Sequence, residues 1–140
     1  MKKHKTLWVG MICAFVPILI TIFLILFVFN QVGKMGENEI LHKTQNYEQL
    51  SQDSLKETTV FFGDSITELC PVEDLYAAYT RKTGVPIINR GISAETTDSM
   101  LKRIEKTVLV MKPKNLVMLM GINDIAAKVD NQQIVNNIKQ

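Results

Sequence analysis

The longest hydrophobic stretch of the chain, Leu7–Phe29, contains no charged side chain. As an α-helix it would span roughly 34 Å, which is enough to cross a hydrocarbon core of about 30 Å. A domain this small has no core that could cover such a helix on every side. A cleaved signal peptide would have a shorter apolar region followed by a small-x-small site, and no such site follows the stretch. Residues 7–29 are therefore predicted to be an uncleaved transmembrane anchor.

Basic residues before the anchor predict its orientation. Lys2, Lys3 and Lys5 precede the hydrophobic stretch, and the positive-inside rule keeps such a segment in the cytoplasm. Residues 1–6 are expected there, and the rest of a single-pass cell-membrane protein is expected to be extracytoplasmic. The formal charge of +2 for the whole chain includes these three lysines, so the exported part is slightly acidic. It has no basic patch of the kind that binds nucleic acid.

Residues 30–57 are mostly polar and are predicted to form a juxtamembrane stalk, in part helical. His42 lies in this segment and is expected to be solvated. The two cysteines are Cys13, inside the anchor, and Cys70, so no disulfide between them is expected. Cys13 is not preceded by the small residues of a lipid-attachment site, and Cys70 is interpreted as a small buried residue.

From residue 58 onward, short apolar runs alternate with helical patterns. The runs predict strands at residues 59–62, 85–89 and 115–120, and the third is apolar enough to be buried on both faces. Helices are expected after each strand: one begins at Pro71, one is capped by Thr96 or Thr97, and one is capped by Asp130. This alternation predicts an α/β domain with a parallel sheet.

The last predicted helix has no glycine or proline stop, and its apolar period still continues at Ile138. Three strands alone would also leave the edges of a buried type of sheet uncovered. Residues 58–140 are therefore expected to be a truncated part of a domain.

Three polar or small residues follow the three predicted strands: Ser65, Gly91 and Asn123. In a sheet of order 2-1-3 the loops after all three strands open on the same carboxyl edge. A serine there needs a base to act as nucleophile, and the oxyanion of acyl transfer needs donors aimed at it. The backbone N–H groups of Ser65 and Gly91 and the side-chain amide of Asn123 are candidate donors.

Neighbouring residues support these strand ends. Gly63 allows a sharp turn before the serine, and Gly121 ends the third strand. Asp64 and Asp124 are expected to accept hydrogen bonds from turn amides. Two charged residues of the second loop, Arg90 and Glu95, remain open between solvated loop charges and the rim of a substrate site.

Three short blocks together resemble the SGNH (GDSL-type) hydrolases, which are esterases and lipases of flavodoxin-like, three-layer α/β/α fold. The blocks are Gly63-Asp64-Ser65-Ile66, Asn89-Arg90-Gly91-Ile92 and Gly121-Ile122-Asn123-Asp124. The resemblance covers residues 58–140. It implies that Ser65 is the nucleophile, that Ser65, Gly91 and Asn123 form the oxyanion hole, and that neither a metal nor an organic cofactor takes part.

The chain departs from the family pattern in one respect. The family's base is the histidine of a late Asp-x-x-His block, and this sequence contains no such block; its histidines are His4 and His42. Two hypotheses remain: the N-terminal part of a membrane-anchored serine esterase, or a degenerate membrane-tethered binding module or inactive fragment. For the esterase, the sequence leaves phospholipid, acetylated glycan and small esters open as substrates, and leaves acyl transfer open beside hydrolysis.

Overall fold

The computed structural model describes residues 2–54 and 56–140, with side chains from Phe15 onward. The chain divides into two compact units, Met1–Asn38 and Glu39–Gln140. Cys13, His4 and the N-terminal lysines therefore lie outside the described side chains.

The first unit is the N-terminal part of one long helix, α1 (Lys2–Gln52). Its described apolar side chains, from Phe15 to Phe29, are exposed. The helix is long and apolar enough to cross a membrane by length and composition. The Thr21 hydroxyl donates to the carbonyl of Pro17 at 2.9 Å, which satisfies one of the few side-chain polar groups of the apolar stretch 7–29.

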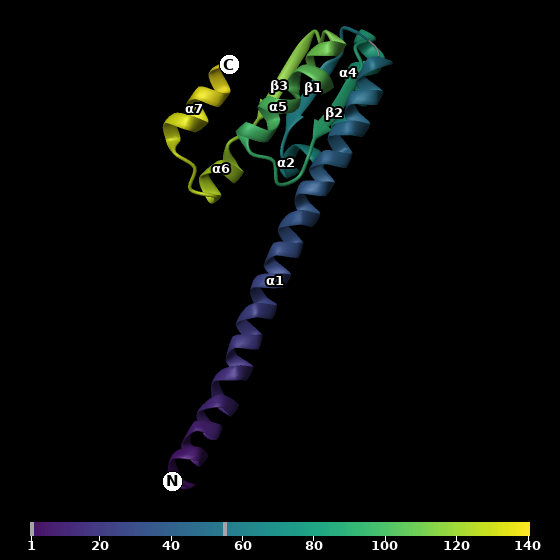
Figure 1. Cartoon of the computed structure of the whole chain (residues 1–140). Helices are drawn as coiled ribbons and strands as arrows, with labels where there is room; N and C mark the ends of the chain where they lie inside the picture. The colour runs from purple at the N-terminus through teal and green to yellow at the C-terminus, as the bar shows by residue number, and fades with distance from the viewer. Residues whose placement is uncertain (1, 55) are drawn as a thin grey trace. The chain divides into compact units, whose positions relative to one another are not determined.

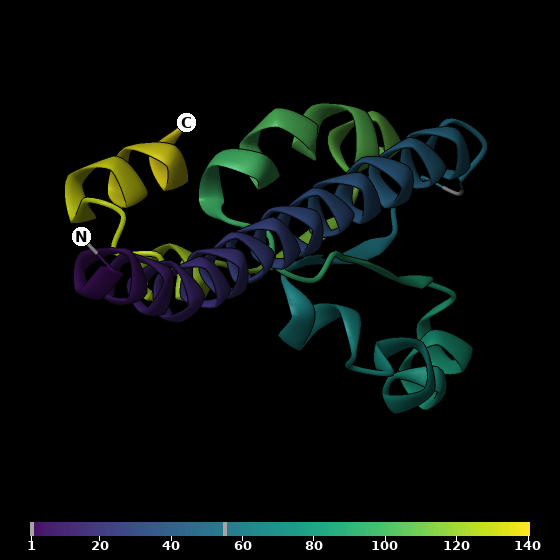
Figure 2. The ribbon, with the colours of Figure 1, turned by 60° about the horizontal axis from the view of Figure 1, so that its bottom comes forward.

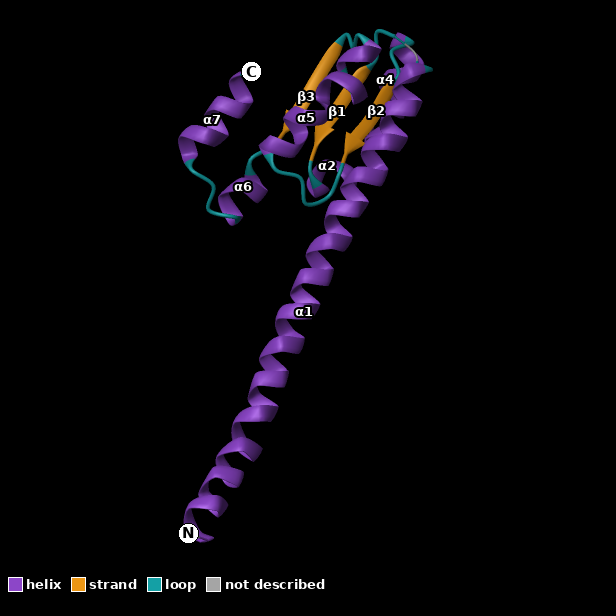
Figure 3. Ribbon diagram, viewed as in Figure 1, coloured by secondary structure: helices purple, strands orange, loops and turns teal. Residues whose placement is uncertain are grey.

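The second unit is built on a parallel sheet of β1 (Thr59–Gly63), β2 (Ile87–Gly91) and β3 (Asn115–Leu119). The strand order is β2-β1-β3, as the sequence predicted, and Figure 3 shows the three strands pointing the same way. Gly63 at the end of β1 pairs in register with Gly91 and with Leu119. All three strands therefore end at one edge.

Helices cover both faces of the sheet, which confirms the predicted three-layer architecture (Figure 2). On one face, α5 (Thr97–Thr107) and a 3₁₀ turn, η1 (Leu109–Met111), lie beside the last turns of α1. On the other lie α3 (Val72–Leu75) and α4 (Ala77–Thr83), where the rings of Phe61 and Tyr76 stack at 5.5 Å. The hydrophobic core lies under α5 and consists of Val60, Phe62, Met100, Val108 and Met111.

The helix caps mostly follow the sequence. Thr96 caps α5 in a reciprocal arrangement with Ser99, and Asp130 accepts from the N–H groups of Gln132 and Gln133 at the start of α7 (Asn131–Lys139). The second strand is displaced by two residues from its predicted range. Two further short helices begin just past the ends of β1 and β3: α2 (Ser65–Glu68) and α6 (Ile122–Ala126).

The structure differs from the predicted stalk over residues 39–54. This segment belongs to the same compact unit as the sheet. The Ser51 hydroxyl is buried and donates to the carbonyl of Thr107 at 2.7 Å, and the Tyr47 hydroxyl donates to the carbonyl of Gly91 at 3.2 Å. The packing of this segment could not be predicted from the sequence, because its contacts are made by polar groups and leave no apolar stripe along the helix.

Candidate active site

Ser65 lies where the central strand passes into α2. The chain leaves β1 at Gly63, Asp64 caps the helix, and Ser65 is its first residue. Asp64 is fully buried, and its Oδ1 accepts from the N–H of Ile66 at 2.9 Å, which confirms the predicted turn hydrogen bond. Ser65 is half-buried, and among the described residues no group accepts a hydrogen bond from its hydroxyl. The site therefore presents a serine hydroxyl at the start of α2, and Figure 1 shows α2 at the carboxyl edge of the sheet.

Two glycines let the backbones approach closely at this edge. A Cβ on Gly63 would lie 2.2 Å from Thr67 Oγ1 and 2.6 Å from the carbonyl oxygen of Leu119. A Cβ on Gly91 would lie 2.3 Å from the backbone nitrogen of Glu68. Neither distance is possible for a real side chain, so α2 sits against the ends of β1 and β2 only because these positions are glycine.

The N–H of Gly91 is already engaged. It donates to Oδ1 of Asn89 at 2.8 Å, so in this conformation it is not free to act as the predicted oxyanion donor. Asn89 also donates through Nδ2 to the carbonyls of Thr67 at 2.7 Å and Cys70 at 3.0 Å. Asn89 therefore ties the end of β2 to the end of α2, a role that the sequence did not reveal. Cys70, predicted to be buried, is half-buried.

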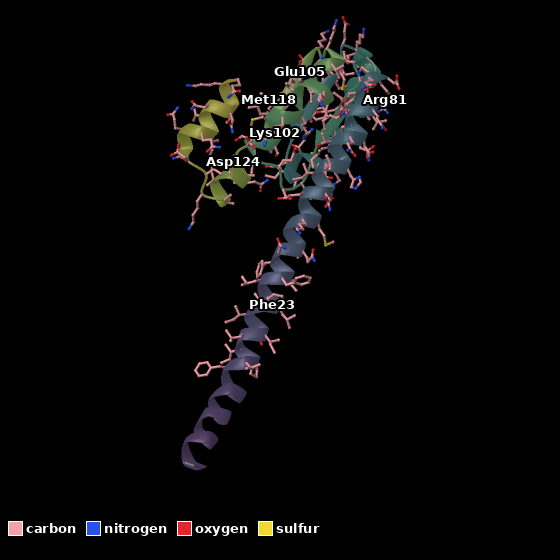
Figure 4. The ribbon with its side chains drawn as sticks, in the orientation of Figure 1. Phe23, Arg81, Lys102, Glu105, Met118 and Asp124 are labelled. Carbon is pink, nitrogen blue, oxygen red and sulfur yellow. The ribbon has the colours of Figure 1, made fainter. Side chains whose placement is uncertain are left out.

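On the other side of Ser65, α6 brings Asn123 and Asp124 to the same edge. Gly121 precedes α6 with a φ of 100°, a conformation that favours glycine. Asn123 donates through Nδ2 to the carbonyl of Glu95 at 2.8 Å. Asp124 is buried and accepts from the N–H of Thr97 at 2.9 Å and from its hydroxyl at 2.6 Å. Asp124, labelled in Figure 4, therefore bonds the start of α5 and not the turn after β3 as predicted.

Residues 92–96 join β2 to α5 and are hydrogen-bonded to both α2 and α6. Glu95 of this loop and Arg90 of β2 are both buried, so neither is a solvated loop charge, which was one interpretation of the sequence. The side chain of Glu95 is completely buried against Arg103, 2% exposed, with Oε2 2.5 Å from Nη2. Arg103 also donates to the carbonyl of Arg90 at 2.9 Å and lies 4.3 Å from the centre of the Phe62 ring. Burial raises the pKa of Glu95, and the guanidinium of Arg103 opposes this. This buried ion pair therefore attaches the 92–96 loop to α5 on the inner side of the loop.

The same loop is bonded from the outside by Glu68, the last residue of α2. Glu68 Oε2 accepts from the Ser93 N–H at 2.6 Å and from its hydroxyl at 2.5 Å, and Oε1 bonds the Lys43 ammonium of α1. Burial raises the pKa of the Glu68 carboxyl, but the hydrogen bonds from Lys43 and Ser93 outweigh it and leave that pKa below its usual value. Ala94, next along the loop, has a φ of 63°, a conformation that costs a side-chain-bearing residue about 1–2 kcal/mol.

Within the part of the chain that the structure describes, no three His, Cys, Asp or Glu side chains gather to hold a metal ion. His42 is exposed on α1. The site therefore consists of one serine, one amide side chain and a network of hydrogen bonds that fixes the loop between them.

The fold is thus a parallel α/β domain with a serine at the carboxyl end of the central strand and an asparagine after the neighbouring strand β3, at the same edge. The family model for GDSL-like lipase/acylhydrolase proteins matches residues 61–140. The chain therefore belongs to the GDSL-like lipase/acylhydrolase family, as its three blocks indicated. No functionally curated protein matches the chain.

Solved structures share the fold. A Streptococcus pneumonia protein, provisionally described as a platelet activating factor, matches with a TM-score of 0.70 at 24% identity. The match covers 81% of this chain and 51% of that protein's chain. A provisionally assigned acylhydrolase from Bacteroides fragilis has a TM-score of 0.55 at 27% identity, over 68% and 48%. A GDSL-like lipase from Bacteroides thetaiotaomicron has a TM-score of 0.55 at 24% identity, over 69% and 49%. The chain thus spans about half the length of the structures it matches.

Proposed function

We propose that the protein is a membrane-anchored serine esterase that hydrolyses carboxylic esters through an acyl-Ser65 intermediate. The observation that carries the proposal is the position of Ser65: the first residue of α2, at the end of the central strand, with its hydroxyl free of partners among the described residues. Membership in the GDSL-like lipase/acylhydrolase family supports the same chemistry. We assign the hydrolase domain to residues 58–140 together with the packed segment 39–54.

In the proposed reaction, Ser65 Oγ attacks the ester carbonyl carbon and its proton passes to a base. The C–O bond to the alcohol then breaks, the alcohol leaves with a proton, and water releases the acid from the serine. Neither histidine of this sequence matches the family's Asp-x-x-His block. The proposal therefore assigns the base to residues of the complete protein outside this chain, which spans about half the length of its structural relatives.

The oxyanion donors in this proposal are the N–H of Ser65 and the side chain of Asn123. An amide carries two N–H donors, and Asn123 uses one of them on the carbonyl of Glu95. The second is left for substrate. Gly91 contributes by its lack of a side chain, since its N–H already donates to Asn89.

We further propose that residues 7–29 anchor the protein, with residues 1–6 in the cytoplasm and the domain outside. The apolar, exposed surface of α1 supports an anchor, and the lysines before it support the orientation. A domain held at the outer membrane surface has access to phospholipids, acetylated glycans and small esters, as donors for hydrolysis or for acyl transfer.

The direct test is the Ser65→Ala variant of the complete protein, assayed in detergent with a short-chain nitrophenyl ester. We expect hydrolysis by the parent protein and none above background in the variant, because the acyl-enzyme cannot form. Unchanged turnover in the variant would remove Ser65 as nucleophile. Tight binding of an ester without turnover in the parent protein would favour a binding module instead.

A further inference from the structure

The helix that carries Ser65 is too short to hold its own position. α2 contains four residues, Ser65–Glu68, which is about one turn and far below the length at which a helix is stable alone. Its orientation therefore depends on contacts at its two ends. At the first end, Asp64 accepts from the N–H of Ile66, the second residue of α2, and Glu68 is the side chain at the other end.

Glu68 connects α2 to the loop on the far side of the candidate oxyanion site. Its Oε2 accepts both from the backbone N–H of Ser93, at 2.6 Å, and from the Ser93 hydroxyl, at 2.5 Å. The carboxylate therefore fixes the distance between α2 and residues 92–96, and that same loop holds Asn123 through the carbonyl of Glu95. A continuous set of hydrogen bonds runs from the serine helix to the asparagine.

Lys43 holds the other oxygen of this carboxylate. Its ammonium bonds Glu68 Oε1 and, at 2.8 Å, Glu39 on the preceding turn of α1. The side chain of Glu68 is 17% exposed and that of Lys43 is 30% exposed, so the pair is partly withdrawn from water. In such a position a charge-assisted hydrogen bond is stronger than on the open surface. One turn further along α1, the Tyr47 hydroxyl bonds the Gly91 carbonyl. Residues 39–52 thus contact both the serine helix and the end of β2.

We propose that Glu68 is a positioning residue that sets the Ser65 helix against the 92–96 loop, and that Lys43 holds Glu68 in place. The last turns of α1 then form part of the working site and do not serve only as a spacer. This inference rests on the proposed function, since it assigns Glu68 and Lys43 an effect on catalysis by Ser65.

The test compares three variants of the complete protein in detergent: Lys43→Met, Glu68→Gln and the double variant. Methionine keeps the apolar stem of Lys43, and glutamine keeps the shape of Glu68. We expect each single change to lower kcat about tenfold, the effect of one ordinary charge-assisted hydrogen bond, with KM within about twofold of the parent. Because the two groups act as one unit, the double variant should be no worse than either single one. Lys43→Arg should restore most of kcat.

Lys102→Met is the matched control, because Lys102 also pairs with an acidic residue, Asp98, but on the exposed surface of α5. It should leave kcat unchanged. The second measurement does not need activity: hydrogen exchange of a peptide covering residues 91–96 should become faster in Lys43→Met than in Lys102→Met.

The outcomes separate the two proposals. Loss of activity in Ser65→Ala with full kcat in Lys43→Met and Glu68→Gln would overturn the positioning role and leave the esterase intact. We call the contacts of Glu68 with Lys43 and Ser93 the Glu68 clamp. Equal hydrogen exchange of residues 91–96 in Lys43→Met and in the control would show that this clamp does not hold the loop, whatever the chemistry of Ser65. A parallel fall in kcat and melting temperature that arginine does not rescue would also reject it, since general destabilisation would then explain the loss. If Glu68→Gln does not fold, the more exposed Lys43 variants supply the same test.

Discussion

The strands β2 and β3 flank β1 in the same register, yet the burial of each differs from what its sequence suggests: the more polar strand is the more buried one. β2 reads IINRG, contains an asparagine and an arginine, and is buried at three of its five positions. β3 reads NLVML and is exposed at four of five. Val117, Met118 and Leu119 each retain about 45% of their exposure, and Figure 4 labels Met118 on this strand. The apolar run 115–120, predicted to be buried on both faces, is therefore the more open of the two.

The difference lies in what packs over each strand. The polar side chains of β2 are covered because they have partners. Half-buried Asn89 donates to carbonyls at the end of α2, and buried Arg90 contacts Ser51 Oγ at 3.3 Å and the Tyr47 ring at 4.9 Å. Among the described residues β3 pairs only with β1. Hydrophobicity predicted the strand, but the covering elements decided its burial.

The largest expected loss of stability that sharpens this comparison is at Arg103, which donates to the carbonyl of Arg90 in β2. Arg103→Met keeps the stem over Phe62 but leaves the Glu95 carboxylate buried without its partner. Breaking such a pair costs about 3–5 kcal/mol of unfolding free energy. Denaturant unfolding of the complete protein measures it, with Lys102→Met, in an exposed pair of the same helix, expected to cost less than about 1 kcal/mol. Similar losses in both variants would show that the Glu95 pair is not buried in solution.

A smaller effect separates the two strands themselves. Ile87→Ala in β2 and Leu119→Ala in β3 remove the same number of carbon atoms, but Ile87 is 8% exposed and Leu119 is 45% exposed. We expect about 2–5 kcal/mol of destabilisation from the first and less than about 1 kcal/mol from the second, measured by thermal and denaturant unfolding. Equal costs in the 140-residue chain would contradict the comparison, because they would show that β3 is covered by residues of this chain.

The smallest effect is the pH dependence of the Glu68 clamp. The pKa of Glu68 is below its ordinary value of 4.5, so its contribution to stability is fully present above pH 4.5 and is lost as the pH falls through the folded-state pKa. We expect Glu68→Gln to cost about 1 kcal/mol at neutral pH, as for a partly exposed ion pair. In unfolding measurements the cost should begin to fall below pH 4.5 and should approach zero below the folded-state pKa. Asp98→Asn, from the exposed pair on α5, is the control, and a cost at Glu68 that does not change with pH would contradict the assigned charge.

Much of the fold could be predicted from local sequence. The caps at Thr96 and Asp130 and the turn at Asp64 follow from patterns within a few residues of one another. The parallel sheet follows from the alternation of strands and helices along the chain, and its strand order is that of the doubly wound sheet considered for it. The three family blocks led directly to the family that matches residues 61–140. Local chemistry was sufficient wherever the deciding partner lay nearby in the chain.

The rest depended on partners far away in the sequence. Glu95 and Arg90 were left open between solvated and rim positions because Arg103, Ser51 and Tyr47 could not be placed beside them. The Gly91 N–H was expected to be free because the Asn89 side chain that accepts from it was not placed. Residues 39–54 were predicted as a stalk because the contacts of Lys43, Tyr47 and Ser51, one helical turn apart, are made by polar groups and leave no apolar stripe in the sequence.

The packed end of α1 has a practical consequence for anyone who wishes to prepare a soluble form. A cut at residue 57, where composition alone would place the start of the domain, removes the Ser51 hydroxyl that bonds Thr107 and the Tyr47 ring beside Arg90. Arg90 is only 6% exposed with this helix in place, so such a protein would expose the guanidinium to water and lose both the hydrogen bond to Ser51 and the contact with the Tyr47 ring. A soluble form of the protein is better begun before Glu39, where the second compact unit starts.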